Sequence, residues 1–417
     1  MKKFTLYFFV LFLFSSLYLT EKFNSLGSIA ISIVICIIFP FVIMSKKEKI
    51  KVHSSSLFLI YGFLTACGIS SLYNADIKIM LNAGIFFLLY LSSMSVVPSY
   101  EKVDINKTIF NSILISQLPI IILPIIISGV NTIPYRGIFY NPNSFGSVVS
   151  VVFVTLLSIV ISKIERIITK RTDKRGKRNL VFHLLSMFLL FFLVILSGSR
   201  TSTLAAGLSV IAGALFLTLR LIKARKFWSS LIKTTFFSFL GAVVLYFLAR
   251  FTPFYNYLYL NILYKFERKS MHGDVLDERG FVWARTLKEA GLWGRGSAYF
   301  SKEVGVTAHN TFINILGETG WVSLLIFIAF LILISIASFK YAISEIDDQY
   351  KYLPLLLLIC FLFSSIGENM LFKVSMIAMF FSMGSIIDFR KKLVNKEKEH
   401  GNPIDRKIQG LMLNVKE

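Results

Sequence analysis

The most prominent pattern in the chain is a series of long apolar runs separated by short polar segments. A helix of about 20 apolar residues crosses the hydrocarbon core of a bilayer. Runs of this length predict twelve spans, at 4–20, 27–44, 56–73, 77–97, 109–130, 144–162, 180–198, 201–219, 231–249, 310–339, 353–370 and 373–389. The sequence therefore predicts an all-α polytopic membrane protein. Its first run is expected to stay as an uncleaved span, because no small-x-small cleavage site follows it.

One polar segment, residues 250–309, is much longer than the other connections. Long segments between helices are usually functional or carry short elements of their own. This one contains two short helical patterns and the Gly-rich joint GLWGRGS, which predicts a structured cap. We therefore expect nine spans in 1–249, a cap in 250–309, three spans in 310–389 and a basic tail in 390–417.

Composition and charge support a membrane protein and assign it an orientation. Hydrophobic residues make up 55% of the chain and charged residues 16%, which excludes an ordinary soluble domain. Roughly two thirds of the 45 Lys and Arg residues lie in alternate connections and at the termini. By the positive-inside rule those segments, and both termini, are cytoplasmic. The net charge of +22 thus orients the protein, and no nucleic-acid-binding motif accompanies it.

Several cationic side chains fall on the outer side in this topology. Arg200 lies in the turn SGSRTS, where an arginine can snorkel to the interface or hold a phosphate group bidentately. Arg279 and Arg285 flank Trp283 on a predicted short helix of the cap. Arg279 and Trp283 are four residues apart and share one face, so the arginine either stacks on the indole or forms a second anion clamp.

Polar residues at the ends of the outer segments are further candidates. His309 precedes a span that Asn310 is suited to cap, and a neutral imidazole there can take a proton from a sugar hydroxyl. Glu318 is half a turn out of phase with His309, so we expect no direct pair. An ionisable group at the edge of a span is costly without a function. Arg136 and Asn143, in YRGIFYNPNSFG, form either a turn and cap or a substrate contact.

Other chemistry-bearing patterns exclude several classes of enzyme. The chain has no Ser-His-Asp set, P-loop or nucleotide fingerprint, and its acidic residues and three cysteines lack metal-ligand spacing. We therefore expect no cofactor and no metal. Glu368 and Asn369, in the last outer turn, are candidates for acceptor binding. Arginines on the outer face of a membrane protein favour a diphosphate-bearing substrate held in the membrane, such as a lipid-linked sugar.

Four motifs, in order, carry a resemblance that starts at about residue 130: RGIFYNPNSFG, LSGSRTSTLA, RGFVWARTLKEAGLWGRGSAYF and AHNTFINILGETG. They resemble the O-antigen ligase/polymerase family of bacterial membrane proteins. The resemblance implies a fold similar to that of lipid-phosphate-using glycosyltransferases. It also implies metal-independent transfer of a saccharide from a polyprenyl diphosphate to an acceptor hydroxyl, outside the cytoplasmic membrane. Arg200, Arg279 and His309 are then the expected catalytic residues. The expected substrate-binding residues are Arg136, Asn143, Arg285, Asn310 and Glu318.

The resemblance leaves the reaction open between two forms. The chain is expected to polymerise lipid-linked repeat units into an O-antigen, capsule or exopolysaccharide; the alternative is ligation of a finished glycan to lipid A core, protein or wall. A polysaccharide flippase is the alternative from another class, disfavoured by the absence of internal repeats and of mid-span charges. The expected partners are a polyprenyl-diphosphate-linked oligosaccharide donor, a saccharide acceptor, the bilayer, and flippase and chain-length regulator proteins, with no nucleic acid.

Overall fold

The computed structural model describes residues 2–20, 37–40, 50, 53–100, 103–169, 174–223 and 279–387, and the single positions 256, 259, 264 and 267. Four predicted features lie wholly or mostly outside these residues: the spans 27–44 and 231–249, the part of the cap before Arg279, and the tail 390–417.

Helices are the regular elements of the described residues, apart from one isolated bridge between Thr20 and Phe139. The α-helices are α1 (Lys2–Leu17), α3 (Ser54–Tyr73), α4 (Ile77–Leu91), α5 (Ile105–Ser128), α6 (Pro142–Ile168), α7 (Lys174–Leu196), α8 (Arg200–Lys223), α12 (Arg279–Glu289), α13 (Thr311–Ala342), α14 (Leu353–Gly367) and α15 (Val374–Ile387). Short π or 3-10 segments are η1 (Ser92–Val96), η2 (Val97–Ser99) and η4 (Tyr299–Val304). Within the described residues, seven helices are long and apolar enough to cross a membrane, and three shorter apolar helices accompany them. These coincide with the predicted spans of the described residues, which confirms the all-α polytopic fold.

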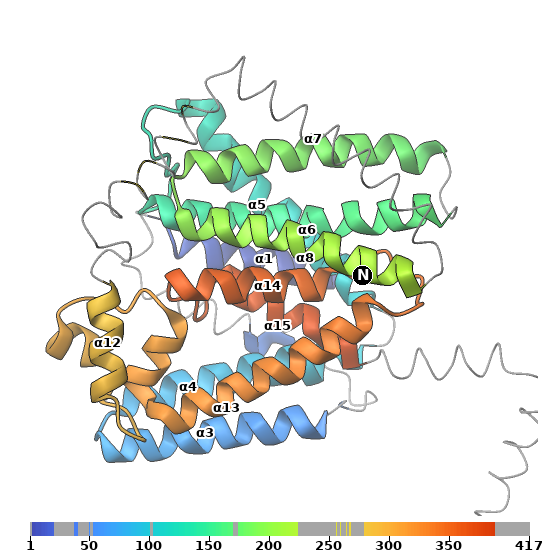
Figure 1. Ribbon diagram of the computed structural model, residues 1–417. Helices are drawn as coiled ribbons and strands as arrows, with labels where there is room; N and C mark the ends of the chain where they lie inside the picture. The colour runs from blue at the N-terminus through green and yellow to red at the C-terminus, as the bar shows by residue number, and fades with distance from the viewer. Residues whose placement is uncertain are drawn as a thin grey trace, which may run out of the picture.

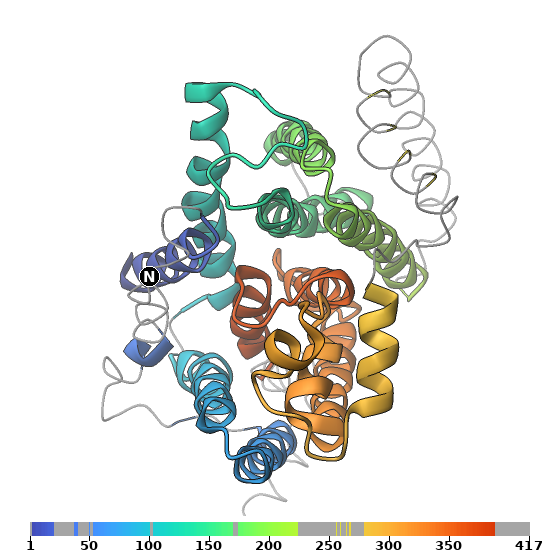
Figure 2. The same cartoon turned by 90° about the vertical axis from the view of Figure 1, so that its left-hand side faces the viewer.

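The apolar helices run side by side, and α12 lies at one end of them (Figure 1). Helix α6 is central, because its membrane-length window is fully buried. It packs against α7, α8, α14 and α5. Helices α3 and α4 form a separate group that packs on α13 (Figure 2). Seen from the end that carries α12, the helices α13, α14 and α15 lie between the α3–α4 pair and α8.

Helix α13 is broken at Gly320, whose backbone angles are φ 88° and ψ 178°. The loop that follows α12 packs into this break. The N–H groups of Arg295 and Gly296 donate to the carbonyls of Gly317 (2.8 Å) and Glu318 (3.2 Å). A Cβ atom at Gly320 would lie 2.2 Å from the carbonyl oxygen of Leu292, so only glycine fits there. The sequence predicted the Gly-rich joint but an unbroken span at 310–339.

Side-chain caps fix where several helices begin. The Asn141 side chain accepts a hydrogen bond from Ser144 N at 2.7 Å at the start of α6. The Asn310 side chain accepts bonds from Phe312 N (2.8 Å) and Ile313 N (3.1 Å) at the start of α13. Each cap satisfies backbone donors that the first helical turn leaves free. The predicted cap role of Asn310 is therefore present, and the caps place the flanking residues Asn143 and His309 at the ends of their helices.

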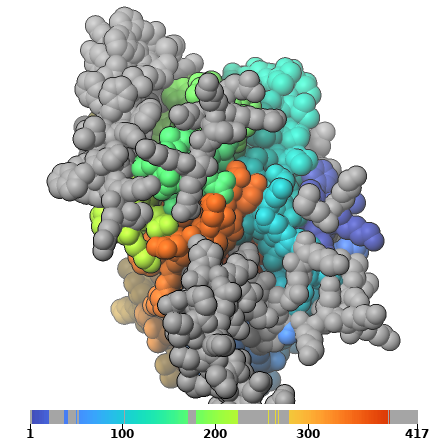
Figure 3. Space-filling view, turned by 90° about the vertical axis from the view of Figure 1, so that its right-hand side faces the viewer, coloured from blue at the N-terminus to red at the C-terminus, as the bar shows by residue number. Residues whose placement is uncertain are grey.

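A buried ion cluster joins helices at the opposite end of the bundle. Glu165 of α6 accepts from Arg220 Nε of α8 (3.1 Å), from Lys351 Nζ (2.7 Å to Oε2) and from the Tyr352 hydroxyl (2.9 Å). Figure 3 looks at this end, where orange residues of the C-terminal half lie beside lime-green residues of α8. Phe216 of α8 and Phe339 of α13, whose ring centroids lie 5.6 Å apart, also contact each other.

Candidate active site

Glu368, in the turn after α14, is the centre of a polar cluster. Its Oε1 atom accepts a hydrogen bond from Asn143 Nδ2 at 2.8 Å. The same atom lies 3.6 Å from Arg279 Nη2, and Oε2 lies 3.3 Å from His309 Nδ1. The three partners come from the starts of α6 and α12 and from the entry to α13. The fold thus brings residues from four separate segments to one carboxylate.

Arg279 is fixed by the position of α12. It is the first residue of that helix, and its Nη1 atom donates to the Gly367 carbonyl at 2.8 Å. Trp283, one turn on, donates from Nε1 to the Ala308 carbonyl at 2.9 Å. This bond attaches α12 to the residue before His309. The indole bond therefore holds the segments of Arg279 and His309 together.

His309 has a backbone conformation that is unusual for its residue type. Its φ is 46°, in the left-handed region, where residues other than glycine are uncommon and where strain often accompanies a functional site. The flanking contacts enforce this geometry. Asn310 Nδ2 donates to the Ile366 carbonyl at 3.0 Å, and Thr311 Oγ1 both donates to the Glu368 carbonyl (3.2 Å) and accepts from Met370 N (2.9 Å). The entry to α13 and the turn 366–370 are therefore one hydrogen-bonded unit.

Arg200 reaches the same region from the start of α8. The Gly367 backbone lies so close to Thr201 that a Cβ atom there would be 2.3 Å from Thr201 Oγ1. Arg279 donates to the carbonyl of the same Gly367, so the two arginines belong to one region. Two guanidinium groups near one another create a positive potential that attracts an anion, and both groups can bind a phosphate bidentately.

The electrostatics keep Glu368 ionised. Burial alone acts to raise the pKa of this carboxyl. The hydrogen bond with His309 and the charges of Lys373, His309 and Arg279 outweigh that effect, so the pKa lies below its ordinary value of 4.5. The Glu368 side chain is 12% exposed, whereas that of His309 is 40% exposed. The Glu368 carboxylate is thus mostly buried and holds the imidazole in place. The His309 imidazole is the more accessible group of the pair.

Three predicted site residues lie apart from this cluster. Arg136 donates from Nη1 to the Tyr140 carbonyl of its own loop at 3.2 Å. Arg285 pairs with Glu289 at 2.8 Å, one turn further along α12. Glu318 lies in a pocket on the side of α13 that faces α3 and α4, and, as expected, it does not pair with His309. The roles of these residues as substrate ligands stay predictions.

Glu368 was predicted only as a candidate for acceptor binding, not as a partner of His309, and Lys373 was not among the predicted site residues. The available signal was a carboxylate and an ammonium group in a short turn between two apolar runs, where charges are rare. Among the described residues, no group of three or more His, Cys, Asp or Glu side chains is arranged to hold a metal ion. The donors of the cluster are instead two guanidinium groups, an imidazole and an amide, which are suited to a phosphate and to hydroxyl groups.

Comparison with known proteins identifies one family that part of the chain resembles. The sequence model of the O-antigen ligase family matches residues 185–328. The matched stretch includes three of the segments that meet at the cluster, those with Arg200, Arg279 and His309. A search of curated proteins found no matching relative. The chain is a multi-pass membrane protein whose residues 185–328 match the family model of O-antigen ligases.

Proposed function

We propose that this protein polymerises polyprenyl-diphosphate-linked oligosaccharide repeat units at the outer face of the cytoplasmic membrane. The observation that carries the proposal is the contact of His309 with Glu368 beside two arginines. An imidazole held by a carboxylate is suited to accept a proton, and two guanidinium groups are suited to a diphosphate. The match to the O-antigen ligase family supports a glycan-joining enzyme.

The two arginines are assigned to the leaving group. Arg200 and Arg279 bind the diphosphate of the donor and stabilise the negative charge that develops as the bond from the sugar C1 to phosphate breaks. In the free protein Arg279 Nη2 is only loosely paired with Glu368, at 3.6 Å. A diphosphate can therefore take this donor without leaving a buried group unpaired, since the carboxylate keeps its bond from Asn143.

His309 is assigned to the acceptor. With Nδ1–H donating to Glu368, the neutral imidazole presents the Nε2 lone pair to an acceptor hydroxyl. The hydroxyl oxygen attacks C1, the proton passes to Nε2, and the diphosphate leaves with the electron pair of the broken bond. Attack opposite the leaving group inverts the anomeric centre. Asn143 and Glu368 position the imidazole and do not contact the reacting atoms.

The orientation follows from the charge distribution. The end of the bundle opposite the cluster contains the basic residues Arg166, Arg220 and Lys223 and leads into the basic connections 163–178 and 220–233. Such segments stay in the cytoplasm. A cysteine at exposed Ser301 should then react with a membrane-impermeant maleimide added to whole cells. A cysteine at exposed Lys223 should react only after the membrane is opened, and the reverse pattern would invert the proposal.

The reaction itself is tested with purified protein in lipid vesicles and lipid-linked repeat units as the sole substrate. A polymerase yields carriers that bear two or more repeat units. A ligase, the second candidate and the one that the family description favours, yields new product only when lipid A core, protein or a wall fragment is added. Movement of repeat units across the bilayer without a new glycosidic bond would contradict both and identify a flippase.

A further inference from the structure

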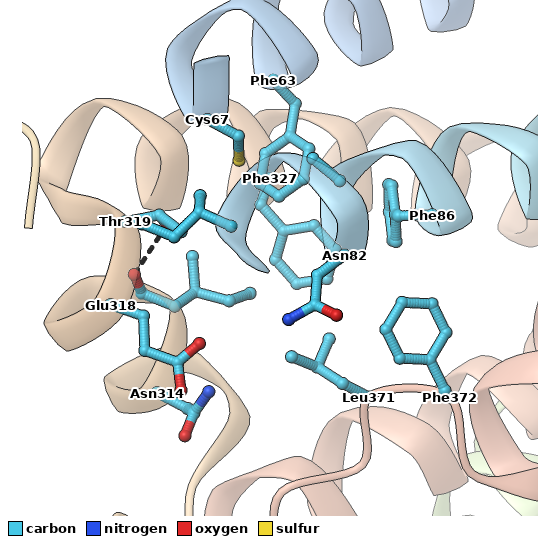
Figure 4. A pocket seen from close by; sticks show the side chains of 13 residues that line it. Phe63, Cys67, Asn82, Phe86, Asn314, Glu318, Thr319, Phe327, Leu371 and Phe372 are labelled. Atoms are coloured by element: carbon cyan, nitrogen blue, oxygen red, sulfur yellow. Dashed lines mark hydrogen bonds between the residues drawn. The ribbon is translucent and has the colours of Figure 1, made fainter. Parts of the chain in front are cut away.

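A second polar pocket lies on the other side of α13 from the arginines. It contains about 520 Å³ of space that atoms do not fill, part of it open to the surroundings. Its polar lining residues are Asn82 of α4 and Asn314, Glu318 and Thr319 of α13, and its aromatic lining includes Phe86 and Phe372. Figure 4 shows the side chains of Asn82, Asn314 and Glu318 around the same space.

The polar side chains of this pocket differ in their hydrogen bonds. Asn82 lies on an apolar helix, is exposed, and makes no hydrogen bond to another side chain or backbone group of the described residues. An amide on a membrane helix is costly unless it meets a polar partner. Asn314 and Glu318 are one helical turn apart on α13, and their side chains form a hydrogen bond with each other. The pocket thus presents one amide without a partner in the described residues beside a hydrogen-bonded amide–carboxyl pair.

The residues of the pocket that carry its polar groups on α13 come before the break at Gly320, at the end of the helix where the loop after α12 packs. The start of α4 is held at the same end, because Asp76 Oδ2 accepts from Ser297 N of the cap at 2.7 Å. The pocket thus lies at the same end of the bundle as this loop.

The position of the pocket relative to the cluster indicates which of the two substrates the pocket binds. Leu371 and Phe372, which line the pocket, follow Glu368 in the same short turn. The arginines approach this turn from α8 and α12, whereas the pocket opens between α13 and the α3–α4 pair, on the opposite side of α13–α15 (Figure 2). Glu368, just before these lining residues in the chain, lies 3.3 Å from His309. A chain that enters from the pocket therefore reaches His309 from the side away from the diphosphate clamp.

We propose that the pocket formed by Asn82, Asn314, Glu318 and Phe372 binds a sugar unit of the acceptor glycan. Amide and carboxyl groups match the donor and acceptor pattern of neighbouring sugar hydroxyls, and aromatic rings match the apolar face of a pyranose. Asn314 and Glu318 lie about 6 and 12 Å beyond Asn310 along α13, by its rise of about 1.5 Å per residue. The bound sugar is thus a neighbour of the reacting unit. This subsite rests on the proposed glycan transfer and adds to it the place of the acceptor.

The test uses two probes that separate the sugar from the diphosphate. One is the repeat-unit oligosaccharide released from the host's own surface polysaccharide, which carries neither lipid nor phosphate. The other is polyprenyl diphosphate without sugar. Binding of each to the full-length protein in nanodiscs is measured for wild type, Asn82→Ala, Glu318→Gln and Arg279→Ala. A matched control is Asn111→Ala, which removes an amide at a similar position on α5.

The subsite requires a selective effect. Asn82→Ala and Glu318→Gln should weaken oligosaccharide binding about tenfold or more and leave polyprenyl diphosphate binding unchanged, while Asn111→Ala changes neither. In the elongation reaction Asn82→Ala should raise the KM for the acceptor and leave kcat intact. Unchanged oligosaccharide binding in both variants, equal weakening of both probes, or no oligosaccharide binding by wild type would overturn the proposal. Failure of the proposed function is distinct, because polyprenyl diphosphate binding would then be absent or indifferent to Arg279→Ala.

Discussion

Nδ1 of His309 lies 3.3 Å from Oε2 of Glu368, across a separation of 59 residues in the sequence. This contact leaves the more exposed imidazole with one nitrogen for chemistry and assigns the other to a buried carboxylate. Because Asn143 donates to the same carboxylate, the histidine before α13 is oriented by residues from the end of α14 and the start of α6.

Replacement of His309 should remove the proton acceptor. His309→Ala is expected to reduce the elongation rate by about 10²–10⁴-fold, the usual contribution of a general base. Glu368→Gln keeps an acceptor for Nδ1–H but loses the charge, so a smaller reduction of about tenfold is expected. Added imidazole should partly restore His309→Ala, because the side chain it replaces is partly exposed. Initial rates with lipid-linked repeat units measure this, and a fully active His309→Ala protein would remove the residue from the mechanism.

Replacement of either arginine should weaken the stabilisation of the departing diphosphate. Arg200→Ala and Arg279→Ala should each cost on the order of 3 kcal/mol at the transition state, or roughly a hundredfold in rate. Arg279→Lys should recover little, since lysine cannot bind bidentately. The matched control is Arg295→Ala, which breaks only a surface pair with Glu303 and should retain near-normal activity. Equal rates for Arg279→Ala and Arg295→Ala would contradict the assigned role.

The lowered pKa of Glu368 predicts how the stability of the folded protein changes as the pH falls. A carboxyl whose folded pKa lies below its ordinary value of 4.5 stabilises the fold fully above that pH, and the contribution is lost as the pH falls through the lower folded pKa. The melting temperature of wild type should therefore exceed that of Glu368→Gln by a constant margin from pH 7 to about 5. The margin should close below pH 4.5. A margin that closes already near pH 6 would show that the carboxyl is not held ionised.

The break in α13 should tolerate only glycine. Gly320→Ala places a Cβ atom 2.2 Å from the Leu292 carbonyl oxygen at a φ of 88°, so a loss of about 1–3 kcal/mol or more is expected. Gly84→Ala on α4 is the control, because nothing lies within 4 Å of its new Cβ atom. Melting temperatures in the same detergent and at the same heating rate compare the two. Equal values would mean that the loop 291–296 does not pack into the break.

The ion cluster around Glu165 should matter for stability rather than for chemistry. Glu165→Gln leaves Arg220 and Lys351 as buried cations without their carboxylate, and loss of one partner of such a cluster costs about 3–5 kcal/mol. Asp347→Asn breaks only the surface pair with Arg166 and should cost at most about 1 kcal/mol. Thermal unfolding measures both. Similar melting temperatures for the two variants would show that the buried cluster is no stronger than a surface pair.

Much of the fold could be read from local patterns. Apolar runs predicted the helices because the length needed to cross a bilayer is a property of each run by itself. The bounds nevertheless differ where packing intervenes. The run at 353–370 ends as helix α14 at Gly367, since Thr201 crowds that glycine and Glu368 turns toward His309. The run at 310–339 continues to Ala342 but is interrupted at Gly320 by the loop after α12.

The sequence by itself determined the apolar spans, the excess of basic residues on alternate connections, and the polar segments that contain Arg200, Arg279 and His309. These are properties of short stretches, read one at a time. Only the tertiary structure decided that Glu368 joins Asn143 and His309, while Glu318 faces a separate pocket. The reason is physical: contacts between distant residues depend on how each helix is rotated and packed against its neighbours, and no local pattern encodes that rotation.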